Sequence, residues 1–113
     1  GPKGLLDLLV VAPCTGTTLG KLANGISDTP VALAVKSHLR RERPVILGVS
    51  TNDALGASMR NIATLKNTKH IFFLPMRQDD VINKPNSLVA DFTKLEDTIE
   101  AALDGVQIQP LFL

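Results

Sequence analysis

Three short runs of consecutive apolar residues divide the chain, and the segments between them carry apolar residues at helical spacing. The runs cover residues 8–12, 44–49 and 71–74, and within them apolar residues do not alternate with polar ones. A short continuous apolar run is typical of a strand that is covered on both faces. We therefore predict three strands of a buried parallel sheet.

The segments between and after these strands are predicted to be helices. Pro30 suits a first helical position, and residues 50–53 offer several N-cap side chains. Thr93 and Glu96 have the spacing of a capping box for the last helix. The predicted helices cover residues 17–25, 30–43, 53–62 and 93–103.

Residues 76–91 are polar and are interrupted by Pro85, so they are predicted to form a long loop with one short helix at 87–90. Loops of this length within a compact domain are usually functional or mobile. The tail at 106–113 is predicted to be a short segment at the edge of the sheet.

Strands that alternate with helices at this spacing predict an α/β fold, a Rossmann-like or flavodoxin-like parallel sheet with helices on both faces. The chain of 113 residues has room for one such domain, over residues 1–113. Open parallel sheets of this type normally contain more strands than the three predicted here. We therefore expect a fragment whose sheet is incomplete at its N-terminus.

Composition and charge argue against several classes of function. Twelve Lys and Arg residues against eleven Asp and Glu residues give a net charge of +1, so no broad field would attract nucleic acid or an anionic membrane. The longest apolar run is far shorter than the roughly 20 residues that span a bilayer. Cys14 is the single cysteine and no secretory signal opens the sequence, so a cytoplasmic location is expected.

The carboxyl ends of the predicted strands are where a ligand is expected to bind, because open parallel sheets hold their ligands there. The loop at 13–18 is the strongest candidate, since it places Thr15, Thr17 and Thr18 between a strand end and a helix N-terminus. Backbone N–H groups and hydroxyls at such a place could hold phosphate, carboxylate or the polar edge of a flavin ring. The alternative is that these threonines only cap the helix.

Residues 12–28, APCTGTTLGKLANGISD, resemble the signature loop and helix of the flavoprotein family that includes the FMN-dependent cysteine decarboxylases. Two later runs, residues 50–56 and 78–87, narrow the resemblance to a branch that supplies the second subunit of a dipicolinate-forming enzyme in spore-forming bacteria. The resemblance implies an FMN-type cofactor and the oxidation of a dihydrodipicolinate-type dicarboxylate. It also implies a homo-oligomer and a catalytic partner, the A subunit, which carries the NADPH site.

The resemblance also assigns residues to the cofactor by position. Asn52 matches the asparagine of the family's second motif, and Asp53 follows it. The implied cofactor-binding residues are Pro13, Cys14, Thr15, Gly16, Thr17, Thr18, Asn52 and Asp53. Recognition of a small dicarboxylate needs a cation and hydrogen-bonding groups, and Lys84, Asn86 and Ser87 combine these in the predicted long loop.

The chain departs from the decarboxylase pattern at Thr17, Val49 and Thr51, where those enzymes carry asparagine, proline and methionine. His38 and His70 show no metal-type spacing, so no metal site is predicted and both are expected to be solvated. The catalytic residues stay unassigned. Besides a role in the oxidoreductase itself, two alternatives therefore stand: a non-catalytic structural partner of the A subunit, and an FMN-dependent decarboxylase-like enzyme.

Overall fold

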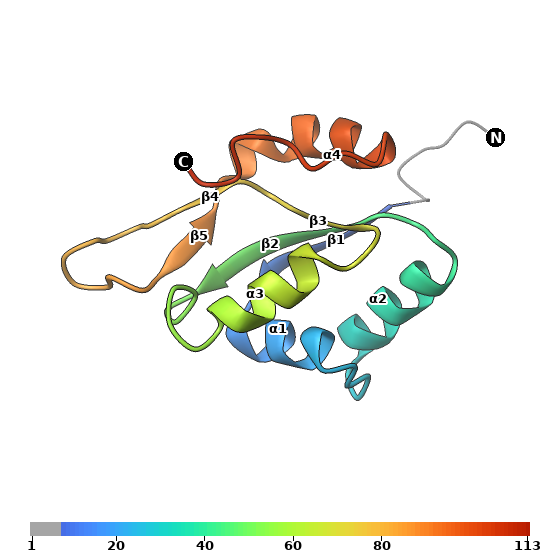
Figure 1. Cartoon of the computed structure of the whole chain (residues 1–113), viewed down its shortest axis with the longest axis horizontal. Helices are drawn as coiled ribbons and strands as arrows, with labels where there is room; N and C mark the ends of the chain where they lie inside the picture. The colour runs from blue at the N-terminus through green and yellow to red at the C-terminus, as the bar shows by residue number, and fades with distance from the viewer. Residues whose placement is uncertain (1–7) are drawn as a thin grey trace.

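The computed structural model describes residues 8–113, in which strands and helices alternate as the sequence predicts (Figure 1). The elements are β1 (Leu9–Cys14), α1 (Gly16–Ala23), α2 (Pro30–Arg40), β2 (Val45–Thr51), α3 (Met59–Lys66), β3 (Ile71–Phe73), β4 (Met76–Arg77), β5 (Leu88–Ala90), the 3-10 turn η2 (Phe92–Lys94) and α4 (Leu95–Leu103). The three predicted strands and the helix that begins at Pro30 are confirmed.

Three parallel strands form the centre of the sheet, with β2 between β1 and β3. Ile46 of β2 lies beside Val10 of β1 on one side and Phe72 of β3 on the other. Beyond β3, the last residues of β2 pair with β5 in the antiparallel direction, and β5 pairs in turn with β4. The predicted parallel sheet is confirmed, and a short antiparallel extension that was not predicted continues it.

Alternate residues of β2 contribute to two cores, one on each face of the sheet. Val45, Leu47 and Val49 pack with residues of α1, α2 and α3, whereas Ile46 packs with Ala102 of α4 and its neighbours. Figure 1 shows α1, α2 and α3 below the sheet and α4 above it. The α/β arrangement with helices on both faces is thus confirmed, and it explains why the apolar run in β2 does not alternate.

Residues 87–90 do not form the predicted short helix, because this part of the chain is a strand. Leu88 lies opposite Thr51 and Val89 lies opposite Ser50, so β5 takes its conformation from hydrogen bonding to β2. Pairing between residues this far apart in sequence outweighs local preference. The prediction failed because the local sequence pattern does not show that residues 88–90 lie beside β2.

The helix predicted at 53–62 begins later than expected, at Met59. The cause is a set of turns in which the backbone carbonyl of Asp53 accepts hydrogen bonds from the N–H groups of Gly56 and Ser58, at 2.9 and 3.0 Å. These turns use the residues that the apolar spacing had assigned to the first helical turn. The result is an ordered polar segment between β2 and α3.

The predicted capping box of Thr93 and Glu96 is also wrong. Thr93 donates both its N–H and its hydroxyl to the carboxylate of Asp91, at 3.0 and 2.6 Å. That carboxylate therefore caps a 3-10 turn ahead of the helix, and α4 starts only at Leu95. The ionised acceptor at Asp91 attracts the hydroxyl that the capping box would have needed.

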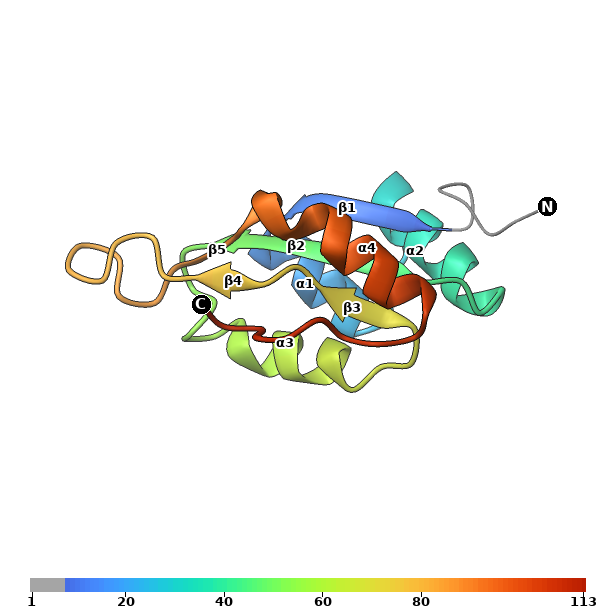
Figure 2. The same ribbon diagram turned by 90° about the horizontal axis from the view of Figure 1, so that it is seen from above.

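The tail at 106–113 covers the outer edge of β3, as predicted. The side chain of Gln107 acts like a neighbouring strand: its Oε1 accepts from the N–H of Phe73 and its Nε2 donates to the Phe73 carbonyl, both at 2.7 Å. Further along, Phe112 forms a parallel bridge with Met76. Figure 2 shows the tail running beside β3 and β4. This edge of the sheet is therefore closed to other strands.

A Gln107→Leu variant is expected to lose about 1–3 kcal/mol of unfolding free energy, because it leaves the backbone N–H and carbonyl of buried Phe73 without these partners. Gln109→Leu is the matched control, since Gln109 is exposed and makes no comparable contact. Chemical denaturation of the purified protein measures both. Equal stability of the two variants would contradict the strand-like role of Gln107.

The hairpin arm, residues 78–87 between β4 and β5, projects from the body of the molecule (Figures 1 and 2). Asp80 orders its tip, because Oδ1 accepts hydrogen bonds from the N–H groups of Ile82 and Asn83 at 3.2 and 3.0 Å. Asp80 also forms a backbone bridge with Lys84. The arm thus keeps its shape through local polar bonds, while Ile82 is 85% exposed.

Residues 8–113 contain no helix that is long and apolar enough to cross a lipid bilayer. Nor do three or more His, Cys, Asp or Glu side chains gather within them as metal ligands would. His70 was expected to be solvated. Its Nε2 is instead buried and has no hydrogen-bond partner among residues 8–113. The residue adopts a positive φ of 71° where the chain enters β3.

Candidate functional site

A polar cleft opens where β1 and β2 end, between the N-terminus of α1 and the turns that lead to α3. Its volume is about 550 Å³. We call this site the polar cleft. The residues that line it are Thr15, Gly16, Thr17, Thr51, Asn52, Asp53, Ala57, Ser58 and Asn61. The loops after two neighbouring parallel strands thus meet at one edge of the sheet, where this class of fold binds its ligands.

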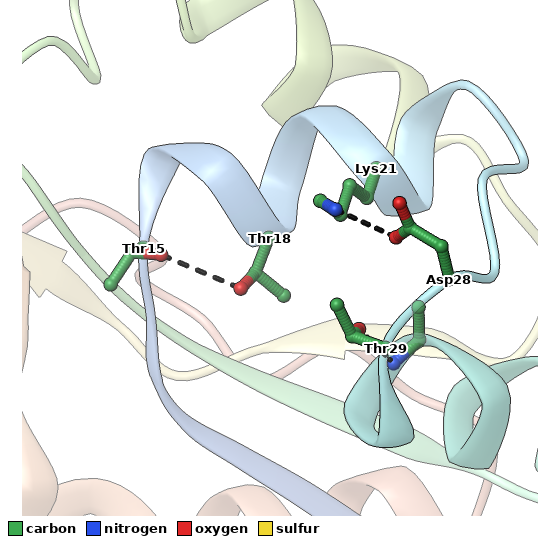
Figure 3. A network of polar contacts seen from close by, with 6 residues as sticks. Thr15, Thr18, Lys21, Asp28 and Thr29 are labelled. Atoms are coloured by element: carbon green, nitrogen blue, oxygen red, sulfur yellow. Dashed lines mark hydrogen bonds and ion pairs between the residues drawn. The ribbon is translucent and has the colours of Figure 1, made fainter.

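The α1 side of the cleft presents backbone donors. The first hydrogen bond within the helix runs from the N–H of Leu19 to the carbonyl of Thr15, at 2.9 Å, so the N–H groups of residues 16–18 have no partner inside the helix. The side chain of Thr15 does not cap them. Its Oγ1 lies 3.4 Å from the hydroxyl of Thr18, a contact drawn as a dashed line in Figure 3. Thr15 therefore occupies the N-cap position of α1, but its side chain makes no capping hydrogen bond.

The opposite side of the cleft is organised around the carboxylate of Asp53. Its Oδ1 accepts hydrogen bonds from the hydroxyls of Thr51 and Ser58, at 2.6 and 2.8 Å. These two bonds hold the pKa of Asp53 below its ordinary value, and the bond from Thr51 has the larger effect. Asp53 is therefore a fixed negative charge at neutral pH, on a side chain that remains exposed.

Gly16 allows the two sides of the cleft to touch. A Cβ at this position would lie 2.9 Å from Oγ1 of Thr51, 3.2 Å from Oδ1 of Asp53 and 3.3 Å from Oγ of Ser58. These are the three atoms of the hydrogen-bonded cluster just described, so a side chain at residue 16 would displace it. The glycine is needed here for close approach, not for a special backbone angle.

The structure separates the remaining residues of the predicted first loop from the polar cleft. Pro13 lines an apolar groove between β1 and α2. Cys14 is fully buried, and desolvation raises the pKa of its thiol to about 12, so it is not a nucleophile in this state. Thr18 lies on the side of α1 that bears Lys21, towards α2 (Figure 3).

The cleft contains four residues that the sequence reasoning did not assign: Thr51, Ala57, Ser58 and Asn61. Ser58 and Asn61 stand three positions apart at the start of α3, so they share one face of that helix. The signal was present in the sequence as polar residues at helical spacing. It was missed because only the apolar positions of this segment were considered, and they do not reveal the hydrogen bonds that bring Ser58 to Asp53.

Among residues 8–113, no lysine or arginine lines the polar cleft. The nearest cation on α1, Lys21, forms an ion pair with Asp28 at 2.6 Å, in the direction of α2 (Figure 3). The charge of Asp53 is therefore uncompensated within the lining. A neutral ligand with both acceptors and donors suits such a cleft better than a free dicarboxylate does.

The three residues predicted to bind a dicarboxylate lie on the part of the hairpin arm that returns to β5, with Ser87 at its base. The carbonyl of Asn86 accepts a hydrogen bond from the N–H of Leu55 at 2.9 Å, which brings the arm against the turns beside the cleft. Lys84 and Asn86 are exposed, whereas Ser87 is only 1% exposed. The arm thus contacts the turns between β2 and α3 through Asn86 and carries the cation of Lys84 further out.

Comparison with known sequences places these features in context. The Flavoprotein family profile matches residues 3–104. The chain is 51% identical over 113 residues to the B subunit of dipicolinate synthase from Bacillus subtilis strain 168, covering 100% of this chain and 56% of that protein. It is 42% identical over 43 residues to flavin prenyltransferase UbiX of Thermoplasma acidophilum, covering 38% of this chain and 24% of that protein. The chain spans little more than half the length of the first relative.

Two solved structures share the fold. The crystal structure of the B subunit of dipicolinate synthase from Bacillus halodurans matches with a TM-score of 0.93 at 50% identity, over 100% of this chain and 58% of that one. The FMN-dependent cysteine decarboxylase SpaF matches with a TM-score of 0.58 at 22% identity, over 88% and 52% of the two chains. The first likeness extends to sequence and fold, and the second to fold alone.

Proposed function

The chain belongs to the flavoprotein family, and from this premise we propose that the polar cleft binds the ring edge of an FMN-type flavin. The observation that carries the proposal is the meeting of two kinds of polar group at the carboxyl ends of β1 and β2. Backbone N–H groups at the start of α1 lie on one side, and the carboxylate of Asp53 lies on the other.

The size and chemistry of the polar cleft suit such a ring. Its volume of about 550 Å³ lies within the range of sites for small molecules. The polar edge of the flavin ring has an N–H group between two carbonyl oxygens, so it needs donors and an acceptor close together. The N–H groups of residues 16–18 are the donors and Asp53 is the acceptor. The phosphate of FMN would be held elsewhere, since no Lys or Arg of residues 8–113 contributes to the lining.

A bound flavin would supply a ring that accepts a hydride and passes it on. The residues of the cleft would hold and orient that ring and exclude water from one edge of it. Asp53, which is ionised at neutral pH, would accept a hydrogen bond rather than donate a proton. Thr51 and Ser58 would keep the carboxylate in place through their hydrogen bonds to Oδ1.

In the complete protein, the chain would act as the B subunit of a dipicolinate synthase, a role supported by the 51% identity to its Bacillus subtilis relative. The reaction would be the oxidation of a dihydrodipicolinate-type dicarboxylate. The assembly would contain several copies of the B subunit, with the NADPH site on the A subunit. Lys84 and Asn86 would meet the dicarboxylate outside the polar cleft, along the hairpin arm, and buried Ser87 would anchor the base of the arm.

A second candidate function is a non-catalytic partner that organises the A subunit. The lining of the polar cleft favours this candidate in one respect, because Asp53 is its single titratable side chain among residues 8–113. The lowered pKa of Asp53 makes its carboxylate a weak base for the hydroxyls of Thr51 and Ser58. Flavin binding distinguishes the two candidates, since an organising partner would need no cofactor of its own.

Titration with FMN, followed by flavin fluorescence, tests the proposal in the purified protein. The wild type is expected to bind FMN, and an Asn61→Leu variant is expected to bind it about tenfold more weakly, because Asn61 lines the cleft with an amide. Asn67→Leu is the matched control at the other end of α3 and should bind like the wild type.

Two results would contradict the proposal. The first is wild-type protein that leaves flavin fluorescence unchanged at every concentration. The second is equal loss of affinity in the Asn61→Leu and Asn67→Leu variants, which would place the flavin outside the polar cleft. Co-purification of flavin-free protein with the A subunit would then favour the organising partner.

A further inference from the structure

We propose that Asp53 is a specificity-determining residue, whose Oδ2 accepts a hydrogen bond from an N–H group on the edge of the bound ring. In the same arrangement, the N–H groups at the start of α1 donate to the carbonyl next to that N–H. In a flavin, the matching groups are N3–H and a neighbouring ring carbonyl. The inference rests on the proposed function, because it assigns which groups of the same cleft donate hydrogen bonds to the ring and which accept them.

Hydrogen bonds within the β2–α3 turns convert this side of the cleft into a set of acceptors. Thr51 and Ser58 each donate a hydroxyl hydrogen to Oδ1 of Asp53. A hydroxyl has one hydrogen, so both groups can offer only lone pairs to a ligand. Among residues 8–113, no other residue donates to Oδ2. Apart from the amides of Asn52 and Asn61, the side chains on this side therefore accept and do not donate.

The α1 side has the opposite polarity. Its first-turn N–H groups have no partner within the helix, Thr15 does not cap them, and the first turn contains no acidic side chain. The positive end of the helix dipole adds to their attraction for a carbonyl oxygen. These N–H groups donate and do not accept.

The two sides stand close enough for neighbouring atoms of one ring to reach both. A Cβ built on Gly16 would lie 3.2 Å from Oδ1 of Asp53, so the start of α1 and the carboxylate border the same space. A ring edge with a carbonyl beside an N–H therefore meets a complementary group at each atom. A carboxylate in the same place would leave its charge facing Asp53, so the cleft selects against it.

Binding of FMN and of 3-methyl-FMN tests this assignment, because the methyl group replaces the N3 hydrogen. The full-length wild-type protein is expected to bind the methylated compound at least about tenfold more weakly. In an Asp53→Asn variant, Oδ1 keeps the two hydroxyl donors and an NH₂ group faces the ligand, so the two affinities are expected to become nearly equal. Asn67→Leu, at the other end of α3 and outside the cleft, is the control and is expected to keep the wild-type ratio.

The possible outcomes separate the inference from the proposed function. Equal wild-type affinity for FMN and 3-methyl-FMN would overturn the assignment of Asp53 and leave flavin binding in place; this comparison needs no variant. An unchanged ratio in Asp53→Asn would overturn it as well, because shape alone would then exclude the methyl group. Wild-type protein that binds neither compound would overturn both the proposed function and the inference.

Discussion

A Gly16→Ala variant is expected to bind FMN at least about tenfold more weakly than the wild type and to lose about 1–3 kcal/mol of unfolding free energy. The new Cβ would lie 2.9 Å from Oγ1 of Thr51, closer than such atoms approach in folded proteins. Thr51 would have to move, and its hydrogen bond to Asp53 would move with it. The variant should therefore disturb both sides of the polar cleft at once.

Gly20→Ala is the matched control for this experiment, four residues further along α1. Its Cβ would lie 3.7 Å from Nδ2 of Asn61, an ordinary contact, and the helix should gain up to about 1 kcal/mol in propensity. Fluorescence titration and chemical denaturation compare the two variants. Wild-type affinity in Gly16→Ala would mean that the cluster around Asp53 is not part of the binding site.

A Phe73→Ala variant is expected to lose about 3–5 kcal/mol of unfolding free energy, more than any other substitution proposed for this chain. Phe73 is fully buried in β3, in the core between the sheet and helices α1 to α3. Removal of the ring leaves a cavity that packed neighbours fill only in part. The hydrogen bonds of its backbone to Gln107 do not depend on the ring and should persist.

Phe112→Ala makes the same chemical change at a residue that is 53% exposed in the C-terminal tail. Its cost is expected to stay below about 1 kcal/mol, since little area returns to water. Because both variants replace Phe with Ala, the difference between their losses of unfolding free energy in denaturant titrations reports the effect of burial. Similar losses in both would contradict the assignment of Phe73 to the core.

The parallel core of the sheet could be predicted from sequence because its apolar runs depend on burial, which marks every residue of a strand covered on both faces. Residues 45–49 are all buried, and the continuous run reflects this directly. The antiparallel extension could not be predicted in the same way. Leu88 and Val89 become a strand only because β2 ends beside them, and no local pattern records that proximity.

The candidate site could likewise be predicted only in part from the sequence. The position of Thr15 and Thr17 between a strand end and a helix start pointed to the α1 side of the cleft, and Asp53 was assigned through a resemblance. Ser58 was not identified, because the turns that bring it back to Asp53 depend on hydrogen bonds that apolar spacing does not reveal. Sequence patterns indicated which loops meet but not the polar cluster between them.

The most direct test of the central claim is a crystal structure of the full-length protein grown with FMN. We expect electron density for the ring edge in the polar cleft, between the N–H groups of residues 16–18 and the carboxylate of Asp53. Density for flavin at another place on the protein, with the polar cleft filled only by water, would contradict it.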